Sequence, residues 1–151
     1  MTALALALLL AVPPPFEGRV VAVHDGDTIS VLRHGHSVRV RLHGIDCPEL
    51  GQAFGRAAKR AASSLVFKRE VRVVPVDVDR YGRPVARVFL GSTDINLELV
   101  RRGLAWHFVR YAPHDSALAN AEREARSARR GLWAERNPVP PWTWRRSRTP
   151  S

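Results

Sequence analysis

Cysteine is almost absent from this chain, because Cys47 is the only one among 151 residues. A single thiol cannot form an intramolecular disulfide and cannot build a cysteine-rich zinc site. The fold must therefore rest on its apolar core, and a hydrophobic content of 45% in a chain of this length suits one folded domain. No protease-like signature surrounds Cys47, so the sequence does not favour a thiol nucleophile assisted by His24 or His43.

Long apolar runs are also missing, apart from the ten residues Ala3–Val12. A bilayer-spanning helix needs about 20 residues, so no stable membrane insertion is expected. The run is followed by Pro13-Pro14-Pro15 and has the length of the apolar core of a secretory signal, although no Lys or Arg precedes it. We expect residues 1–15 to be an N-terminal export segment and the protein to be secreted or periplasmic; without export it would be cytoplasmic.

Acidic residues are scarce relative to basic ones. The chain has 14 Asp and Glu against 24 Lys and Arg, a formal net charge of +10. Such an excess predicts attraction to polyanions, nucleic acids among them. Charge alone does not identify a ligand, because many basic domains bind nothing in particular.

Five short stretches alternate apolar and polar residues, which is typical of β-strands. They are Arg19–Val23, Thr28–Leu32, Ser37–His43, Glu70–Val76 and Pro84–Leu90.

Three further segments have helical periodicity. The first is Gln52–Phe67, with an apolar stripe of Phe54, Ala58, Ala61 and Leu65. The second begins at Ile95 after a capping Asp94 and stops at Gly103; the third is Ser116–Arg130, capped by Asp115 and ended by Gly131.

This order of elements predicts a mostly β fold with some α structure. Five strands with a helix between the third and fourth match an OB-type five-stranded Greek-key barrel, here with about three helices. The barrel domain should span residues 16–136. The remaining residues, 137–151, are rich in Pro, Trp and Arg, so we expect an extended tail whose Trp142 and Trp144 fold back on the barrel.

The chemistry-bearing residues concentrate in Arg39–Glu49, a strand that runs into a loop. Alternation places Arg41 on the polar face of the strand. The loop then presents Asp46 and Glu49 on either side of Pro48, which restricts the backbone between them. A guanidinium beside two fixed carboxylates suits a site that binds a cation, activates water and neutralises a phosphate.

A second pair of acids follows the first predicted strand: Asp25 and Asp27 lie on either side of Gly26 in the turn Asp25-Gly26-Asp27-Thr28. Asp27 and Asp46 are hard oxygen ligands at neighbouring strand ends, suited to Ca²⁺ or Mg²⁺. Asp25 is better explained as a turn residue, since aspartate before glycine is ordinary turn chemistry.

Five motifs occur in order along the chain: D-G-D-T at 25–28, R-L-x-G-I-D-x-P-E at 41–49, D-R-Y-G-R at 79–83, G-L-A-W at 103–106 and G-L-W at 131–133. Together they resemble the staphylococcal nuclease family, also called thermonuclease-like, over roughly Gly18–Trp144. The family's architecture is the OB barrel that the strand pattern predicts.

The resemblance implies a Ca²⁺-dependent nuclease, with Mg²⁺ less expected, that cleaves DNA and RNA with little sequence specificity and leaves 3′-phosphate ends. It implies that Asp27, Asp46 and the backbone carbonyl of Cys47 hold the ion. Glu49 would be the general base, and Arg41 and Arg83 would contact the phosphate.

By the same resemblance, Arg80 and Tyr81 would lie near the phosphate end of the nucleotide, and Tyr111 would line the nucleotide pocket. The chain departs from the family pattern at three places. Cys47 replaces a threonine, Val109 replaces a second pocket tyrosine, and Leu50-Gly51-Gln52 replaces a long lysine-rich loop. We expect a monomer that prefers single strands and has no obligate protein partner.

Two other functions remain open at this point. A non-catalytic OB module could bind single strands through basic and aromatic side chains, although it would not need every residue named above. A protein-interaction role for the Pro-Trp tail is suggested only by its composition. Trimming the chain after Trp133 would test it, because loss of a partner with retained nuclease activity would support that role.

Overall fold

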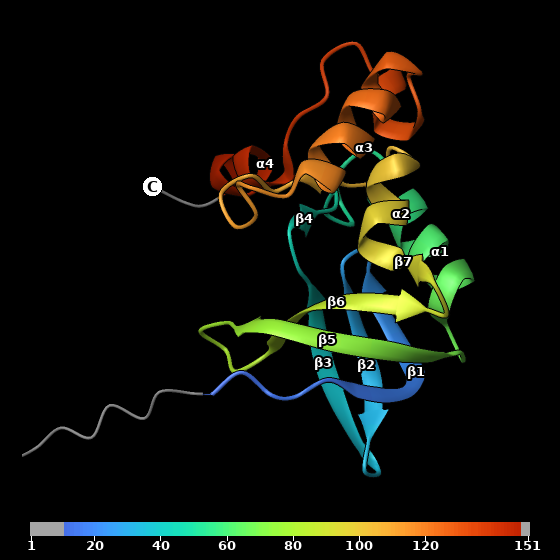
Figure 1. The fold of residues 1–151 in the computed structure, drawn as a ribbon. Helices are drawn as coiled ribbons and strands as arrows, with labels where there is room; N and C mark the ends of the chain where they lie inside the picture. Colours follow the sequence, from blue (N-terminus) through green and yellow to red (C-terminus); the bar gives the residue numbers. More distant parts are fainter. Residues whose placement is uncertain (1–10, 149–151) are drawn as a thin grey trace, which may run out of the picture.

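Five strands close into a barrel in the computed structural model, which describes residues 11–148 (Figure 1). They are β1 (Phe16–Asp25), β2 (Thr28–Arg33), β3 (His36–Leu42), β5 (Glu70–Val78) and β6 (Pro84–Leu90). Antiparallel pairs run in the order β3-β2-β1-β5-β6, and a parallel pairing of β3 with β6 closes the ring. This confirms the predicted OB-type barrel. Residues 1–10 of the expected export segment lie outside the described residues.

The interior of the barrel is built from the alternating apolar residues of these strands. Val20, Val40 and Val73 are fully buried, while Arg39 points outward. A short strand β7 (Thr93–Asp94) pairs antiparallel with the end of β6, and β4 (Ile45–Asp46) pairs with β8 (Trp106–His107) beside the barrel. The predicted bounds of β6 are confirmed, and those of the other strands differ by a few residues.

The helices gather at one end of the barrel (Figure 1). They are α1 (Gly55–Val66), α2 (Ile95–Arg101), α3 (Ser116–Ser127), the 3₁₀ helix η1 (Gly131–Ala134) and α4 (Pro141–Ser147). Asp94 and Asp115 cap α2 and α3 as predicted, each side chain accepting a backbone N–H. No helix in the described range is long and apolar enough to cross a membrane.

The first helix begins three residues later than the sequence pattern predicts, at Gly55 instead of Gln52. Phe54 has a left-handed backbone (φ 67°), which cannot belong to a right-handed helix. The buried stripe is Ala58, Ala62 and Val66, so only Ala58 of the predicted stripe is fully buried.

The closure of the barrel is secured by the buried side chain of Asn96 in α2. Its amide Nδ2 donates to the carbonyl of His43 (2.9 Å) and to that of Ala86 (3.1 Å), while its Oδ1 accepts from Val88 N (3.2 Å). One side chain therefore joins the end of β3 to β6, next to the pairing of Arg41 with Val85. The start of the Arg41–Glu49 loop is thereby held in a defined position.

The C-terminal tail is partly helical, so the prediction of an extended tail was wrong. Pro141 occupies the first turn of α4, where proline is favoured because that N–H has no helical partner anyway. Trp142 then stacks on Phe108, with ring centroids 5.1 Å apart and planes 5° apart, and meets Trp106 edge-on. The tail thus packs on β8 and on the segment after it, and residues 11–148 contain four α-helices where about three were predicted.

Candidate active site

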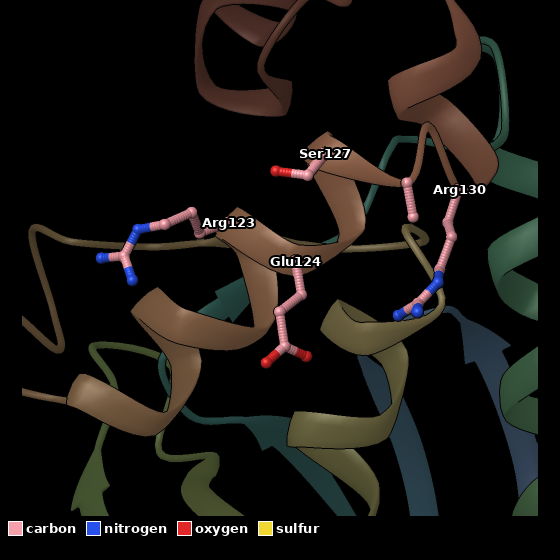
Figure 2. A pocket seen from close by; sticks show the side chains of 5 residues that line it. Arg123, Glu124, Ser127 and Arg130 are labelled. Carbon is pink, nitrogen blue, oxygen red and sulfur yellow. The ribbon is translucent and has the colours of Figure 1, made fainter.

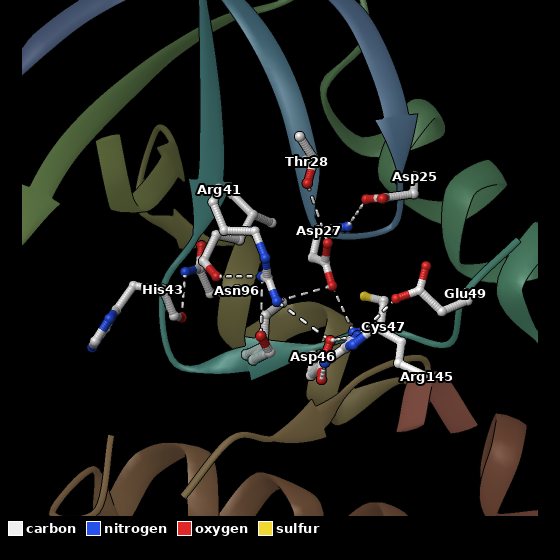
Figure 3. Close-up of polar contacts among 12 residues, drawn as sticks. Asp25, Asp27, Thr28, Arg41, His43, Asp46, Cys47, Glu49, Asn96 and Arg145 are labelled. Carbon is white, nitrogen blue, oxygen red and sulfur yellow. Dashed lines mark hydrogen bonds and ion pairs between the residues drawn. The ribbon is translucent and has the colours of Figure 1, made fainter. Parts of the chain in front are cut away.

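Two buried aspartates meet at the end of the barrel (Figure 3). Asp27 lies in the β1–β2 turn and is 6% exposed; Asp46 lies in β4 and is 1% exposed. The turn is held by Asp25, whose Oδ1 accepts from Asp27 N at 3.0 Å, so the interpretation of Asp25 as a turn residue is confirmed. β4 is held by pairing with β8, where Asp46 faces Trp106.

Arg41 links the two aspartates. Its Nη2 is 3.4 Å from Asp27 Oδ2 and 3.3 Å from Asp46 Oδ1. Its Nη1 donates to the carbonyls of Leu42 (2.8 Å) and Ile45 (3.1 Å). Burial acts to lower the pKa of Arg41, but Asp27 and Asp46 outweigh it and the pKa is raised. The guanidinium is therefore charged and fixed in direction.

Cys47 contributes its backbone to the cluster formed by Asp27, Arg41 and Asp46. Its N–H donates to Asp27 Oδ2 at 2.7 Å, which ties the second loop to the first. Burial raises the pKa of the Cys47 thiol well above its ordinary value, so the thiol is neutral and unsuited to act as a nucleophile. Its sulfur packs next to Gly26, where an added Cβ would be only 2.7 Å from Sγ.

Glu49 stands at the rim of the cluster, with its side chain 34% exposed. Gln52 positions its backbone: Gln52 Oε1 accepts from Glu49 N at 3.2 Å, and Gln52 N donates to Glu49 O at 2.8 Å. The short segment Leu50-Gly51-Gln52 is thus part of a tight turn that fixes the backbone of Glu49.

Gly55 is required by this turn, because a Cβ at position 55 would lie 1.8 Å from the carbonyl oxygen of Glu49. We expect Gly55→Ala to lower the free energy of unfolding by about 2 kcal/mol, the usual size of an overpacking defect, and to displace Glu49. Urea denaturation would measure it. Gly51→Ala is the matched control, since its Cβ would meet nothing closer than 3.5 Å. Equal stability of the two variants would contradict the prediction.

Sequence reasoning missed Arg145, which lies in α4. Its Nη2 is 2.7 Å from Asp46 Oδ2, and its Nη1 is 3.1 Å from Asp46 Oδ1 and 2.7 Å from Glu49 Oε1 (Figure 3). Hydrogen bonds to Asp46 raise the pKa of Arg145 further above its ordinary value. No local signal marked this residue, because its partners precede it by nearly a hundred positions.

Arg83 lies in the turn between β5 and β6, where it contacts Asp79 and Tyr81 of the same turn. Its Nε donates to Asp79 Oδ2 at 2.6 Å, and Asp79 Oδ1 also accepts from the backbone N–H of Tyr81 and of Arg83. Arg80 donates to the hydroxyl of Tyr81 at 2.8 Å, and both side chains are exposed. Within the described residues, the ion-pair partner of Arg83 is Asp79 and not a carboxylate of the cluster.

Asp79 is a second residue whose role the sequence analysis did not identify, although its spacing to Tyr81 and Arg83 is that of an aspartate-stabilised turn. Burial acts to raise its pKa, but hydrogen bonds from Arg83 and Tyr81 prevail and lower it. A lowered pKa in the folded state adds stability above the unfolded-state pKa and loses it as pH falls below about 4.

We therefore expect Asp79→Asn to cost roughly 1 kcal/mol at pH 7, with the deficit shrinking as the pH falls from about 4 to 2. Denaturation midpoints across that range would measure it. Asp77→Asn removes the same charge two residues upstream without touching Arg83, and should cost less at pH 7. A deficit for Asp79→Asn that does not change with pH would oppose the assignment.

Tyr111 is exposed and meets Phe108 edge-on, with ring centroids 4.8 Å apart. Val109, at the position of the family's second pocket tyrosine, is also exposed. The structure thus brings Tyr111 together with Phe108 and, through it, with Trp142 of α4.

The two histidines beside the cluster have structural contacts. His24 Nε2 is 2.7 Å from Ser30 Oγ, and the backbone carbonyl of His43 accepts from Asn96. Burial lowers the pKa of both histidines.

The charges of the cluster fit a divalent cation. Four carboxylates and two guanidinium groups lie together, so the group carries a net charge of −2 when all six are ionised. The carboxylates are those of Asp25, Asp27, Asp46 and Glu49, and the guanidinium groups are those of Arg41 and Arg145. Burial, and next the neighbouring Asp27, raise the pKa of Asp25 to about 7. Burial also raises the pKa of Asp46, despite its contacts with both arginines.

The donor set is small. Within residues 11–148, no three or more His, Cys, Asp and Glu side chains are arranged to hold a metal ion. An ion here would rest on the carboxylates of Asp27 and Asp46, with backbone oxygen and water completing its shell, which is a coordination that Ca²⁺ and Mg²⁺ accept. The residues therefore fit a hard divalent ion and do not form a closed cage.

Two open hollows lie on the described surface. One is lined by Arg123, Glu124, Ser127, Ala128 and Arg130 on and after α3, and shares no residue with the cluster (Figure 2). The other includes Leu50, Gly51 and Gln52, directly after Glu49, together with Arg56 and Arg60. Only the second adjoins the loop that carries the cluster's acids.

Comparison with known proteins places this geometry in a family. The sequence profile of the family described as "Staphylococcal nuclease homologue" matches residues 39–135. The chain is 42% identical over 157 aligned positions to a protein of Shigella flexneri named "Micrococcal nuclease", covering 96% of this chain and 90% of that one.

A Haemophilus influenzae protein named "Uncharacterized endonuclease" is 43% identical over 129 positions, covering 85% of this chain and 72% of that protein. A rice protein (Oryza sativa subsp. japonica) named "Probable staphylococcal-like nuclease CAN3" is 39% identical over 128 positions, covering 85% of this chain and 32% of that protein. Together with the OB barrel, these similarities show that the chain belongs to the staphylococcal nuclease family and is a nuclease.

Proposed function

We propose that this nuclease is Ca²⁺-dependent, hydrolyses DNA and RNA with little sequence specificity, prefers single strands and leaves 3′-phosphate ends. The proposal rests on one observation: the charged guanidinium of Arg41 is held between the carboxylates of Asp27 and Asp46, and Glu49 follows three residues after Asp46. This arrangement combines cation ligands, a phosphate-binding guanidinium and a base within one loop and one turn.

Each group has a role that follows from its contacts. Asp27 and Asp46 would hold the ion with the backbone carbonyl of Cys47, and the bound ion would supply positive charge for the phosphate and lower the pKa of water. Because carbonyls orient Arg41, its guanidinium needs little reorganisation when charge develops on the phosphate oxygens. Arg83, oriented by Asp79, is the second arginine that we assign to the phosphate.

The reaction balances as a hydrolysis. A water oxygen forms a bond to phosphorus while the bond from phosphorus to O5′ breaks, which leaves a 3′-phosphate and a 5′-hydroxyl. Glu49, 34% exposed at the rim, accepts the proton that the attacking water loses. The departing O5′ takes a proton from solvent water, and Glu49 afterwards returns its own proton to solvent, so one water is consumed for each bond cleaved. Arg80, Tyr81 and Tyr111 are exposed side chains that can contact the rest of the nucleotide.

The test is the release of acid-soluble nucleotide from single-stranded DNA, duplex DNA and RNA by the purified protein. Ca²⁺, Mg²⁺ and a chelator are compared, beside an Arg41→Ala, Glu49→Ala double variant that excludes a contaminating nuclease. We expect cleavage with Ca²⁺ only, and products that a polymerase extends only after phosphatase treatment. A folded protein that binds DNA but cuts nothing with any metal would instead support the non-catalytic binding module.

A further inference from the structure

Arg145 occupies the oxygens that a cation at Asp46 would need. It takes both carboxylate oxygens of Asp46, at 2.7 and 3.1 Å, and one oxygen of Glu49 at 2.7 Å (Figure 3). Asp46 is 1% exposed and also contacts Arg41, so little of its carboxylate is left for another partner. A guanidinium placed there also repels a metal cation, since its charge is permanent.

The helix that carries Arg145 is docked by several contacts. Trp142 stacks on Phe108 and meets Trp106 edge-on. Just before the helix, the carbonyl of Val139 accepts from Gln52 Nε2 at 2.6 Å. The helix and the residue before it therefore contact three parts of the site: the Asp46 strand, the Glu49 turn, and the aromatic residues Trp106 and Phe108 in and just after β8.

We propose that α4 is a latch that closes the site in the metal-free enzyme, with Arg145 standing in for the divalent cation. Metal binding must displace Arg145 from Asp46 and Glu49. This inference rests on the proposed function, because it takes Asp46 as a ligand of the ion.

Release of the latch would act on two parts of the site together. Loss of Arg145 frees Asp46 for the ion and Glu49 for the attacking water. If Trp142 leaves with it, one face of Phe108 is uncovered beside Tyr111, where the nucleotide is expected. The latch thus couples metal binding to exposure of the substrate surface. Because only molecules with an open latch can bind the metal, the apparent affinity for the metal equals that of the open form multiplied by the fraction of molecules that are open.

Calcium binding measured by titration calorimetry, without substrate, tests the latch. We compare the full chain with Arg145→Gln and with Arg146→Gln, the neighbouring residue of α4, which makes the same change in net charge without touching a carboxylate of the cluster. We expect Arg145→Gln to bind Ca²⁺ on the order of tenfold more tightly than the unaltered chain, and Arg146→Gln to bind within about twofold of it. Arg145→Lys keeps the positive charge but cannot bind both carboxylate oxygens of Asp46 at once, so its Ca²⁺ affinity should lie between those of the unaltered chain and Arg145→Gln.

Hydrogen exchange of the amides of 141–147 gives a second readout. In the unaltered chain, saturating Ca²⁺ should speed this exchange; in Arg145→Gln it should already be fast without Ca²⁺. Equal Ca²⁺ affinity in the unaltered and Arg145→Gln chains, or slower exchange of α4 on adding Ca²⁺, would overturn the latch while leaving the proposed function intact. Absence of Ca²⁺ binding in every variant would overturn the proposed metal dependence and the latch with it.

Discussion

Replacing Arg41 with alanine should lower kcat on single-stranded DNA by on the order of 10³, the size of effect seen when a preorganised donor to a developing oxyanion is removed. The reason is the position of Arg41. Its Nη1 is bound to two backbone carbonyls and its Nη2 lies between Asp27 and Asp46, so the guanidinium is aimed before substrate arrives.

The same change should destabilise the fold by on the order of 3 kcal/mol, because it leaves Asp27 and Asp46 buried without the cation they share. Stability and activity must therefore be measured separately, by urea denaturation and by initial rates under conditions where each variant is folded. Arg41→Lys keeps the charge but cannot bridge both carboxylates, so it should recover stability more than kcat.

Arg39→Ala is the matched control, because Arg39 is on the same strand but points outward and contacts His24. It should leave kcat within about threefold of the unaltered enzyme, the range expected where no donor to the reacting phosphate is lost. Full turnover in folded Arg41→Ala would remove Arg41 from the mechanism.

Glu49→Gln is expected to lower kcat by on the order of 10² or more while affinity for DNA stays nearly unchanged. An amide has the shape of the carboxylate and can still accept a hydrogen bond from Arg145, but it cannot take a proton from water. The turn formed with Gln52 depends on the backbone of Glu49 and should persist. A purely structural role for Glu49 would not produce this separation of turnover from affinity.

Rates at saturating substrate give kcat, and anisotropy of a labelled single strand in chelator gives affinity. Glu70→Gln, an exposed residue of β5, is the control for the loss of one negative charge and should change neither quantity. Unchanged turnover in Glu49→Gln would exclude Glu49 as the base. A parallel fall in turnover and affinity would instead indicate that it positions the substrate.

Local patterns in the sequence predicted most of the fold. Alternation placed Val40 inside the barrel and Arg41 on the other face of β3, because strand periodicity is a property of neighbouring residues. The caps at Asp94 and Asp115 were predicted for the same reason. Two predictions failed because they depended on a backbone conformation or a distant contact. The left-handed backbone of Phe54 makes α1 begin at Gly55 and not at Gln52. In the tail, a helix whose Trp142 packs on Phe108 forms where an extended segment was expected.

The sequence by itself determined the barrel, the family and the residues of the Arg41–Glu49 loop, since all of these are written in short motifs and their order. Only the tertiary structure decided which charges meet. It placed Arg83 on Asp79 and brought Arg145 to Asp46 and Glu49. The physical reason is that an ion pair between residues almost a hundred positions apart depends on how α3, η1 and α4 pack, and no local pattern encodes that packing.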